Sequence, residues 1–427
     1  MYLPRTLTAR LERLVATFPV VVVSGARQVG KSTLLRHTLG RRFSMVVFDP
    51  VADVEGARED PDLFLRSRTP PVILDEIQYV PQLVAAIKRR IDVDRTPGQY
   101  VLTGSHQWGV MRSLSESLAG RAVFLDLEGF SLAEAAGRGL DPPWLGAWLT
   151  DPEGFLRRPI RRLPAPFPVF EQVWRGSLPE ARFLPADVLP DFFAAYQRTY
   201  IERDVRLMAD VSDWYTFGRF VRLVAALTAQ EINHSQLGRA LGVTPQTAQR
   251  WLGILRATFQ WHEVPAFTGN VIKRVSRRPK GYLADTGIAC ALQAIPSPEV
   301  LGGHPLWGAL FETAVVGDIR KQCAALPTRP NLYHWRSHGG AEVDLVLEWG
   351  GRYYPIEIKA KSHPTARDAS GLRAFRSAHP NLLIAPGLII APTETAYPVT
   401  ESDHVIPWDV AVPEAGAGVE AGSTLSP

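Results

Sequence analysis

The chain has 427 residues, which is more than one hydrophobic core usually supports, so we expect two or three domains. A hydrophobic fraction of 46% is typical of a globular protein, and a formal net charge of +4 permits contact with nucleic acid without requiring it. No apolar run is long enough to span a bilayer and the N-terminal segment lacks the pattern of a signal peptide, which argues against a membrane protein and predicts a cytoplasmic one. The two cysteines, Cys290 and Cys323, form no CxxC pair and are expected to be reduced core residues.

Residues 1–137 alternate short apolar runs with helical patterns, which is typical of a parallel α/β sheet. The run VVVV at residues 20–23 is continuous and β-branched, as expected for a strand that is buried on both faces. The candidate strands are residues 20–23, 45–48, 72–74, 100–102 and 122–126. We therefore expect an α/β domain over this part of the chain.

The stretch GARQVGKS lies directly after the first candidate strand and directly before a helical pattern. Gly25 and Gly30 allow positive-φ turns, which point consecutive backbone N–H groups inward at clustered phosphate oxygens. Lys31 can reach the β- and γ-phosphates, and the Ser32 hydroxyl can bind Mg²⁺. The helix that follows adds its positive N-terminal end. The pattern predicts a site for ATP and Mg²⁺.

Two adjacent carboxylates, Asp75 and Glu76, follow the candidate strand at residues 72–74. Asp75 at the carboxyl end of a strand would hold Mg²⁺ beside Ser32, directly or through water. Glu76 is the candidate base, or orienting group, for the attacking water. An isolated Asp-Glu pair would be an ordinary solvated turn, but with the phosphate-binding pattern upstream we favour a catalytic pair.

A further strand ends in the polar sequence Thr103-Gly-Ser105, which could contact the γ-phosphate. Downstream, Arg121 has a guanidinium that could stabilise transition-state charge within the chain or in a neighbouring subunit of a homo-oligomer. An ordinary surface arginine is an equally good interpretation of Arg121, and both stay open.

The part of the chain that follows, residues 138–228, has no nucleotide-binding motif. Residues 138–170 are rich in proline, tryptophan and arginine and are expected to form a linker or insertion. Residues 171–228 have a helical pattern and are predicted to form a helical lid region. Within them, the IERD stretch at residues 201–204 is interpreted as helix-surface ion pairs. At the far end of the chain, residues 413–427 are rich in Gly, Ala and Ser and are expected to be disordered.

Residues 229–285 have the pattern of a helix-turn-helix with a wing. A short helix should end at Gly242, and Thr244 followed by Pro245 is a favourable start for a second helix. A basic cluster lies in or next to the candidate wing at residues 264–275 and consists of Lys273, Arg274, Arg277, Arg278 and Lys280. The second helix has no dense basic face, so binding of DNA or RNA through the wing and use of the winged helix for packing or protein contact both stay open.

Residues 286–412 contain a second group of charged residues. The motifs AEVDLVL and YYPIEIK are candidate strands, and period two places Glu357 and Lys359 on one face of the second. Asp344 on the first strand could meet them, and Glu312 in an upstream helical pattern could be a further metal ligand. The carboxylates could hold Mg²⁺ against a phosphodiester while the lysine orients water. A solvated strand face is an equally good interpretation.

The ordered series of motifs resembles a bacterial and archaeal family of AAA-type P-loop ATPases that carry a C-terminal winged helix and a PD-(D/E)XK nuclease-like domain. The resemblance extends from about residue 4 to about residue 380. In chain order, the motifs are GARQVGKST (25–33), LDEIQ (74–78), LTGS (102–105), SLAGR (117–121), YIERDV (200–205), PKGYLADTGI (279–288), HWRSHGGAEVDLVLE (334–348) and PIEIKA (355–360). The series is far more specific than any one motif in it.

The resemblance implies a P-loop NTPase parallel sheet, then a helical and winged-helix region, then a C-terminal α/β domain with a restriction-endonuclease-like fold. The implied nucleotide and Mg²⁺ contacts are Lys31, Ser32 and Asp75, with Glu76 catalytic and Thr103 or Ser105 near the γ-phosphate. Gly25, Gly30 and Thr33 are the further nucleotide-binding residues. The nuclease-like signature maps to Glu312, Asp344, Glu357 and Lys359.

Two functions from different classes follow from these patterns. The first is an ATPase whose nucleotide state moves a helical and winged-helix region that carries a Mg²⁺-dependent nuclease-like domain on DNA or RNA. The second is a nucleotide-gated regulatory or scaffold protein whose C-terminal domain binds a partner and cleaves nothing. The modest net charge favours the second, and a steep salt dependence of nucleic-acid affinity would favour the first.

Overall fold

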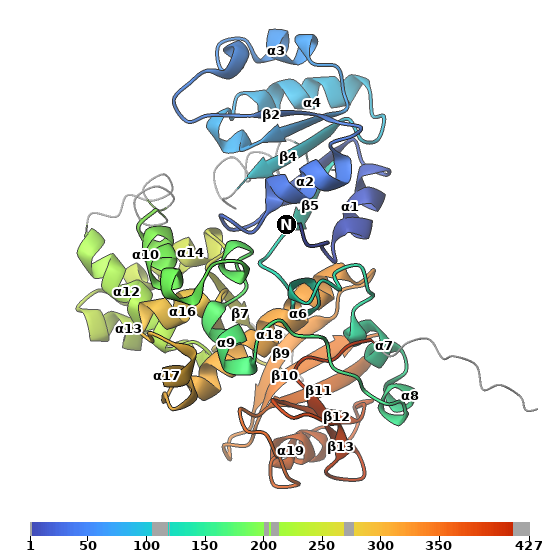
Figure 1. Cartoon of the computed structure of the whole chain (residues 1–427), viewed down its shortest axis with the longest axis vertical. Coiled ribbons are helices and arrows are strands. Elements are labelled where there is room, and N and C mark those ends of the chain that lie inside the picture. The colour runs from blue at the N-terminus through green and yellow to red at the C-terminus, as the bar shows by residue number, and fades with distance from the viewer. Residues whose placement is uncertain are drawn as a thin grey trace, which may run out of the picture.

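A computed structural model describes residues 2–104, 118, 120–199, 205, 213–268 and 277–412. The N-terminal sheet lies at one end of the long axis, and a helical region and the C-terminal sheet lie next to each other towards the other end (Figure 1). The expectations for Ser105, for the IERD stretch, for most of the wing and for the tail at residues 413–427 concern residues outside this description. In the described part of the chain, no helix combines the length and the apolar character that crossing a membrane requires.

The N-terminal region is a five-stranded sheet in which all neighbouring strands are parallel, in the order β2-β3-β4-β1-β5. The predicted α/β class is confirmed, and all five predicted strands are present. The interior strand β1 is buried at every residue, which is why its sequence is a continuous valine run. The strands are β1 (Val20–Ser24), β2 (Ser44–Val47), β3 (Val72–Asp75), β4 (Tyr100–Gly104) and β5 (Ala122–Asp126), and the helices are α1 (Thr8–Val15), α2 (Lys31–Leu39), α3 (Pro61–Ser67) and α4 (Leu83–Val93).

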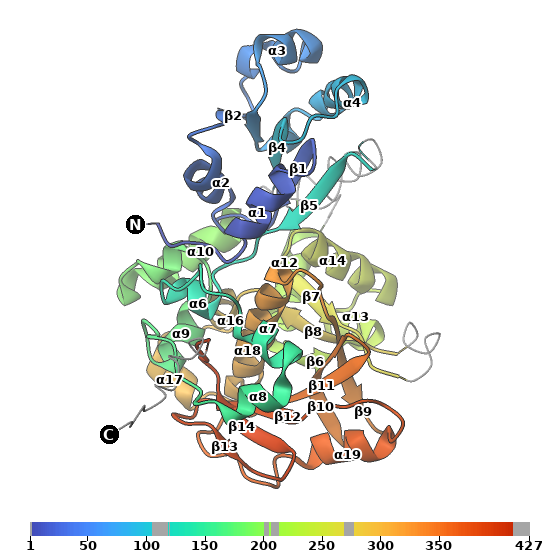
Figure 2. The same ribbon diagram turned by 90° about the vertical axis from the view of Figure 1, so that its right-hand side faces the viewer.

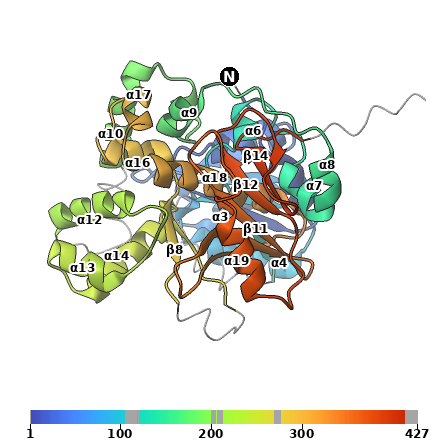
Figure 3. The same ribbon diagram turned by 90° about the horizontal axis from the view of Figure 1, so that it is seen from below.

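The middle region combines helices with a three-stranded antiparallel sheet in the order β6-β8-β7. The predicted pair of helices is α13 and α14: Gly242 ends the first with φ +71°, and the Thr244 side chain accepts a hydrogen bond from the Thr247 N–H at the start of the second. Figure 3 shows α12, α13 and α14 to one side of the C-terminal sheet. The elements are α9 (Val169–Arg175), α10 (Leu189–Thr199), α12 (Trp214–Ala226), α13 (His234–Leu241), α14 (Pro245–Ala257), α16 (Thr286–Leu292), α17 (Pro298–Gly302), β6 (Gln230–Glu231), β7 (Trp261–Val264) and β8 (Lys280–Leu283).

One hydrophobic cluster joins the N-terminal and middle regions. It runs from Leu11, Val23 and Leu34 of the N-terminal region into Trp174 and Phe217 of the helical region. Because these apolar side chains share one core, the sheet that carries the phosphate-binding pattern is packed directly on the helical region.

The C-terminal region is a six-stranded mixed sheet in the order β13-β14-β12-β11-β10-β9. Two separate clusters cover its faces: Leu345 and Ile356 pack with Phe311 of α18, whereas Val346 packs with Phe375 of α19. Cys290 and Cys323 are free and buried, as predicted. The elements are α18 (Trp307–Ala325), β9 (Asn331–Arg336), β10 (Glu342–Trp349), β11 (Arg352–Ile358), α19 (Ser370–Ala378), β12 (Gly387–Ala391), β13 (Tyr397–Pro398) and β14 (Asp403–Pro407).

Residues 138–170, which the sequence suggests as a linker or insertion, pack against the C-terminal sheet. They include α7 (Trp144–Thr150) and α8 (Pro152–Arg157), which lie beside that sheet in Figure 2. The Tyr354 hydroxyl donates a hydrogen bond to the Leu149 carbonyl at 2.6 Å, and the Trp148 ring contacts the Tyr354 ring edge-on. Trp144, Trp148 and Phe155 of this segment therefore belong to the core that covers one face of the C-terminal sheet.

Candidate functional site

The loop between β1 and α2 has the backbone that the glycine pattern predicts. Gly25 has φ +152° and Gly30 has φ +92° as the residue that precedes α2. A Cβ atom on Gly25 would lie 2.0 Å from the Leu127 carbonyl oxygen, so only glycine fits there. Ser32 and Thr33 lie in the first turn of α2, with Ser32 half-buried and Thr33 exposed.

Lys31 is folded back over this loop. Its ammonium donates hydrogen bonds to the Gly25 and Ala26 carbonyls, both at 2.8 Å, and the residue is only 5% exposed. The loop thus already surrounds one positive charge at the amino end of α2. A lysine and the N-terminal end of a helix at one loop form a suitable environment for phosphate.

Asp75 and Glu76 are linked to Thr103 on the neighbouring strand. The Thr103 hydroxyl donates a hydrogen bond to the Asp75 carboxylate and accepts one from the Glu76 N–H at 3.0 Å. Glu76 has φ +60°, so the chain turns sharply after β3, and the Gln78 side-chain amide donates to the Glu76 carboxylate. Since β1, β3 and β4 are parallel, their carboxyl ends meet at the edge of the sheet where the phosphate-binding loop lies.

Arg121 forms an ion pair with Asp92 of α4 in its own chain. This contact supports the interpretation of Arg121 as a surface arginine, since the guanidinium has a partner within the N-terminal region.

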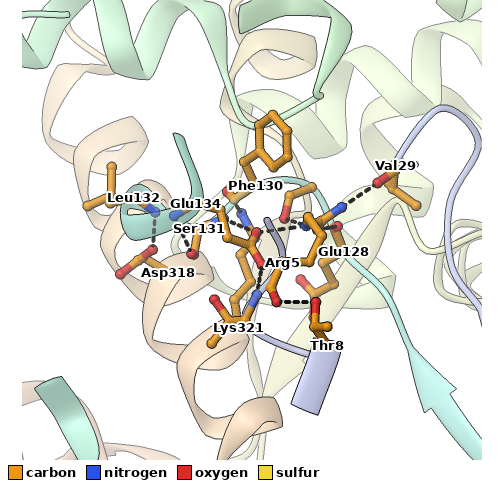
Figure 4. Close-up of polar contacts among 12 residues, drawn as sticks. Arg5, Thr8, Val29, Glu128, Phe130, Ser131, Leu132, Glu134, Asp318 and Lys321 are labelled. Atoms are coloured by element: carbon orange, nitrogen blue, oxygen red, sulfur yellow. Dashed lines mark hydrogen bonds and ion pairs between the residues drawn. The ribbon is translucent and has the colours of Figure 1, made fainter. Parts of the chain in front are cut away.

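Arg5 connects the phosphate-binding loop to the segment that follows β5 (Figure 4). Its guanidinium donates hydrogen bonds to the Val29 carbonyl at 2.7 Å and to the Glu128 carbonyl at 2.6 Å. It also forms an ion pair with Glu134 at 3.1 Å and lies over the Phe130 ring, and it is 3% exposed. Sequence reasoning missed this residue because a buried arginine has no local pattern. The sequence signal that could have pointed to this region is the capping box formed by Ser131 and Glu134 at the start of α6 (Leu132–Ala135).

The same segment is bound on its other side by α18 (Figure 4). The Asp318 carboxylate accepts a hydrogen bond from the Leu132 N–H at 2.7 Å, and the Lys321 ammonium donates to the Phe130 carbonyl at 3.0 Å. Burial raises the pKa of Asp318, which the hydrogen bond from the Leu132 N–H partly offsets. We call residues 127–134 the junction segment, because it contacts the phosphate-binding loop on one side and α18 on the other.

The predicted C-terminal residues come together around a lysine that the sequence analysis had placed elsewhere. The Lys280 ammonium lies 2.7 Å from the Glu312 carboxylate and 2.9 Å from the Asp344 carboxylate. The other Asp344 oxygen accepts a hydrogen bond from the Ile358 N–H at 2.9 Å. The pairing of β10 with β9 shifts register between residues 343 and 346, an irregularity of the kind that redirects a side chain next to a site.

The assignment of Lys280 to an accessible basic cluster is wrong. Lys280 is 8% exposed and its charge is neutralised by carboxylates, so it is not available to a phosphate backbone. Arg277 and Arg278 remain candidates for such a surface, while Lys273 and Arg274 lie outside the described residues.

Glu357 and Lys359 form an ion pair next to this group. The second Glu357 oxygen is buried and has no hydrogen-bond partner among the described residues. Burial, and then the charge of Asp344, raise the pKa of Glu357 to about 8. Burial and Asp344 likewise raise the pKa of Glu312 to about 8. Burial lowers the pKa of Lys280, but the charges of Asp344 and Glu312 outweigh it and leave that pKa raised.

A divalent ion needs several oxygen, nitrogen or sulfur donors that converge on one point. Within the described ranges, which omit residues 1, 105–117, 119, 200–204, 206–212, 269–276 and 413–427, no three His, Cys, Asp or Glu side chains are arranged to hold a metal. At the C-terminal site the Lys280 ammonium lies between Glu312 and Asp344, which are two of the three predicted carboxylate ligands. At the phosphate-binding loop Mg²⁺ would be held mostly by phosphate oxygens, and the residues present, Ser32 and Asp75, fit that role.

The parallel sheet, the glycine loop that leads into α2 and the Asp-Glu pair after β3 define the N-terminal region as an AAA-type P-loop ATPase domain. A family model described as "AAA domain" matches residues 17–136. Two models described as domains of unknown function, DUF8612 and DUF4143, match residues 168–299 and 307–410.

The chain is 30% identical over 406 residues to "Uncharacterized protein Mb2031c" of Mycobacterium bovis and, equally, to "Uncharacterized protein Rv2008c" of Mycobacterium tuberculosis. Each alignment covers 95% of this chain and 83% of the mycobacterial protein. The chain belongs to the same family as these two proteins.

Among solved structures, the chain is similar to the Walker-type ATPase PABY2304 of Pyrococcus abyssi, with 17% identity, a TM-score of 0.40 and coverage of 68% of this chain and 98% of that one. It is also similar to the Thermotoga maritima RuvB Holliday junction branch migration motor, with 15% identity, a TM-score of 0.29 and coverage of 64% and 95%. Both TM-scores are too low to establish a shared overall fold.

Proposed function

We propose that this protein hydrolyses ATP with Mg²⁺ and that its nucleotide state is passed to the C-terminal domain through the junction segment. The observation that best supports ATP hydrolysis is that Thr103 links Asp75 and Glu76. All three residues lie at the edge of the sheet where the phosphate-binding loop lies. A buried threonine that bonds to both residues fixes them relative to each other before nucleotide arrives.

Each residue has a role in this proposal. Lys31 leaves the Gly25 and Ala26 carbonyls and neutralises the β- and γ-phosphates. Ser32 and Asp75 would hold Mg²⁺, which when bound would neutralise the charge that develops on the phosphate oxygens. Glu76 orients the water that attacks the γ-phosphorus and accepts its proton, while Thr103 keeps the carboxylate of Asp75 in place.

The junction segment supports the second part of the proposal. Gly25 approaches the Leu127 carbonyl too closely for any side chain, and Arg5 bonds to the phosphate-binding loop at Val29 and to the segment at Glu128. When Lys31 moves to a phosphate, the loop loses two hydrogen bonds to its carbonyls, and the loop backbone is in contact with the junction segment. The segment bonds in turn to α18, which carries Glu312.

For the C-terminal domain we propose two candidate activities. Metal-dependent cleavage of DNA or RNA is supported by the proximity of Asp344, Glu357 and Lys359 at the ends of β10 and β11. A nucleotide-gated regulator that cleaves nothing is the second candidate, and the specific observation that favours it is the position of Lys280 between Glu312 and Asp344.

The test compares wild type with Lys31→Ala and Asp344→Ala. We expect Lys31→Ala to lower ATP turnover by about 100-fold or more, because the γ-phosphate loses its main cation. Turnover that survives Lys31→Ala would refute the ATPase proposal. Labelled single- and double-stranded DNA and RNA are then incubated with Mg²⁺, with and without ATP. Cleavage that Asp344→Ala removes supports the nuclease, and the absence of cleavage with intact ATP turnover supports the regulator.

A further inference from the structure

The group formed by Lys280, Glu312 and Asp344 comes from three separate parts of the chain. Lys280 begins β8 in the three-stranded sheet, Glu312 lies on α18, and Asp344 lies on β10. Lys280 belongs to the part of the chain that matches one family model, and both carboxylates belong to the part that matches another. The middle region therefore supplies a cation to the C-terminal domain.

The position of Lys280 is fixed by its surroundings. Lys280 pairs with Val264 of β7 on one side and with Glu231 of β6 on the other. The segment after β7 is itself joined to β9, because the Phe267 N–H donates to the His334 carbonyl and the His334 N–H donates to the Pro265 carbonyl, at 2.6 and 2.9 Å. The strand that carries the lysine is therefore linked to the C-terminal sheet through β7, because the segment after β7 bonds to β9.

Both Asp344 oxygens and one Glu312 oxygen, which a divalent ion between these two carboxylates would need, are already engaged. One Asp344 oxygen accepts from Lys280 and the other from the Ile358 N–H. The Glu312 oxygen bound by Lys280 also accepts from the Tyr282 hydroxyl at 2.8 Å. Nitrogen–oxygen distances of 2.7 and 2.9 Å suit an ammonium, whereas Mg²⁺ requires oxygens at about 2.0–2.1 Å and close to octahedral geometry.

We propose that Lys280 is the resident cation of the C-terminal carboxylate site, that its ammonium takes the place of a divalent metal between Glu312 and Asp344, and that the site binds no divalent metal while β8 holds its place. The inference deepens the second candidate function given above for the C-terminal domain. It makes that domain a nuclease-like scaffold whose acidic pair serves as the attachment point of the middle region.

The test measures Mn²⁺ binding to the full-length, nucleotide-free protein by electron paramagnetic resonance of the free ion. Wild type is compared with Asp344→Asn, with Lys280→Met and with the double variant. Lys361→Met is the matched control, because Lys361 forms a more exposed ion pair with Asp368 in the same domain. We expect Asp344→Asn to leave wild-type binding unchanged. Lys280→Met should raise Mn²⁺ affinity by about ten-fold or more, and the added Asp344→Asn should remove that gain.

A second measurement needs no variant and so does not depend on Lys280→Met folding. Acetylation of native wild type by acetic anhydride, read by peptide mass spectrometry, should modify Lys361 readily and spare Lys280, with or without millimolar Mn²⁺. Wild-type Mn²⁺ binding that Asp344→Asn abolishes would overturn the inference, as would Mn²⁺ that exposes Lys280 to acetylation or a folded Lys280→Met that gains no affinity. ATP turnover of the same preparations reports separately on the ATPase proposal.

Discussion

The substitution Arg5→Met tests the junction between the phosphate-binding loop and the C-terminal domain. Arg5 and Glu134 are 3% and 4% exposed, and the guanidinium lies 3.1 Å from the carboxylate. Methionine keeps much of the volume of the arginine stem but removes the charge and every donor. The substitution leaves Glu134 as a buried carboxylate without its counter-ion, and it leaves the Val29 and Glu128 carbonyls without the hydrogen bonds they accept from Arg5.

The expected cost follows from these contacts. Breaking a buried ion pair by removal of one partner costs about 3–5 kcal/mol. Glu134 keeps hydrogen bonds from the Thr6 N–H at 2.7 Å and from the Ser131 N–H at 2.9 Å. Because these bonds still stabilise the carboxylate, we expect the cost of breaking the ion pair to lie near the lower end of that range. The carbonyls that lose a donor add on the order of 1 kcal/mol. We therefore expect Arg5→Met to lower the free energy of unfolding by about 4 kcal/mol.

Urea denaturation followed by circular dichroism measures this change. Arg89→Met is the matched control, because Arg89 pairs with Asp62 at the surface, where loss of the pair should cost less than about 1 kcal/mol. The double variant Arg5→Met with Glu134→Gln should recover part of the loss, since it removes the uncompensated charge. A loss below about 1 kcal/mol for Arg5→Met, or equal losses for Arg5→Met and Arg89→Met, would refute the reasoning.

Three further predictions concern the nucleotide site and one buried histidine. Glu76→Gln should keep ATP affinity, measured by fluorescent-nucleotide titration, and lower turnover by about 100-fold or more, because water loses its proton acceptor. Gly25→Ala should lower ATP affinity at least about ten-fold, because its Cβ would lie 2.0 Å from the Leu127 carbonyl oxygen; Gly303→Ala, whose Cβ meets nothing within 4 Å, is the control. Burial holds the pKa of His262 well below its usual range, and both ring nitrogens lack partners among the described residues. The unfolded chain therefore binds a proton below about pH 6.5 that the folded chain does not, so stability falls with falling pH by about 1.4 kcal/mol per unit for this group. His262→Phe should remove that slope in urea denaturation at pH 5 to 7.

Each of these predictions has an outcome that contradicts it. Glu76→Gln with wild-type turnover would exclude Glu76 as the proton acceptor. Equal ATP affinity in Gly25→Ala and Gly303→Ala would mean that the close approach to Leu127 does not matter for the loop. An unchanged pH slope in His262→Phe would mean that the imidazole is protonated in the folded protein.

The sequence by itself determined the parts of this protein whose signals are local. The valine run, the glycine loop and the start of α2 are consecutive, and each has a backbone requirement that few residue types satisfy: burial on both faces for β1, and positive φ at Gly25 and Gly30. The start of α14 could likewise be predicted, because Thr244 caps the first turn of the helix and Pro245 is favoured at its first position. Both residues lie next to each other in the sequence.

Only the tertiary structure decided which distant charges meet. Nothing local distinguishes Lys280 from the arginines just before it, and its burial depends on the packing of β8 against α18 and β10. Arg5 likewise became part of the nucleotide region because the segment before α1 and the junction segment lie against the phosphate-binding loop. The physical reason is the same in both cases. A charge can be buried only where partners from other elements compensate it, and those partners are set by how the elements pack.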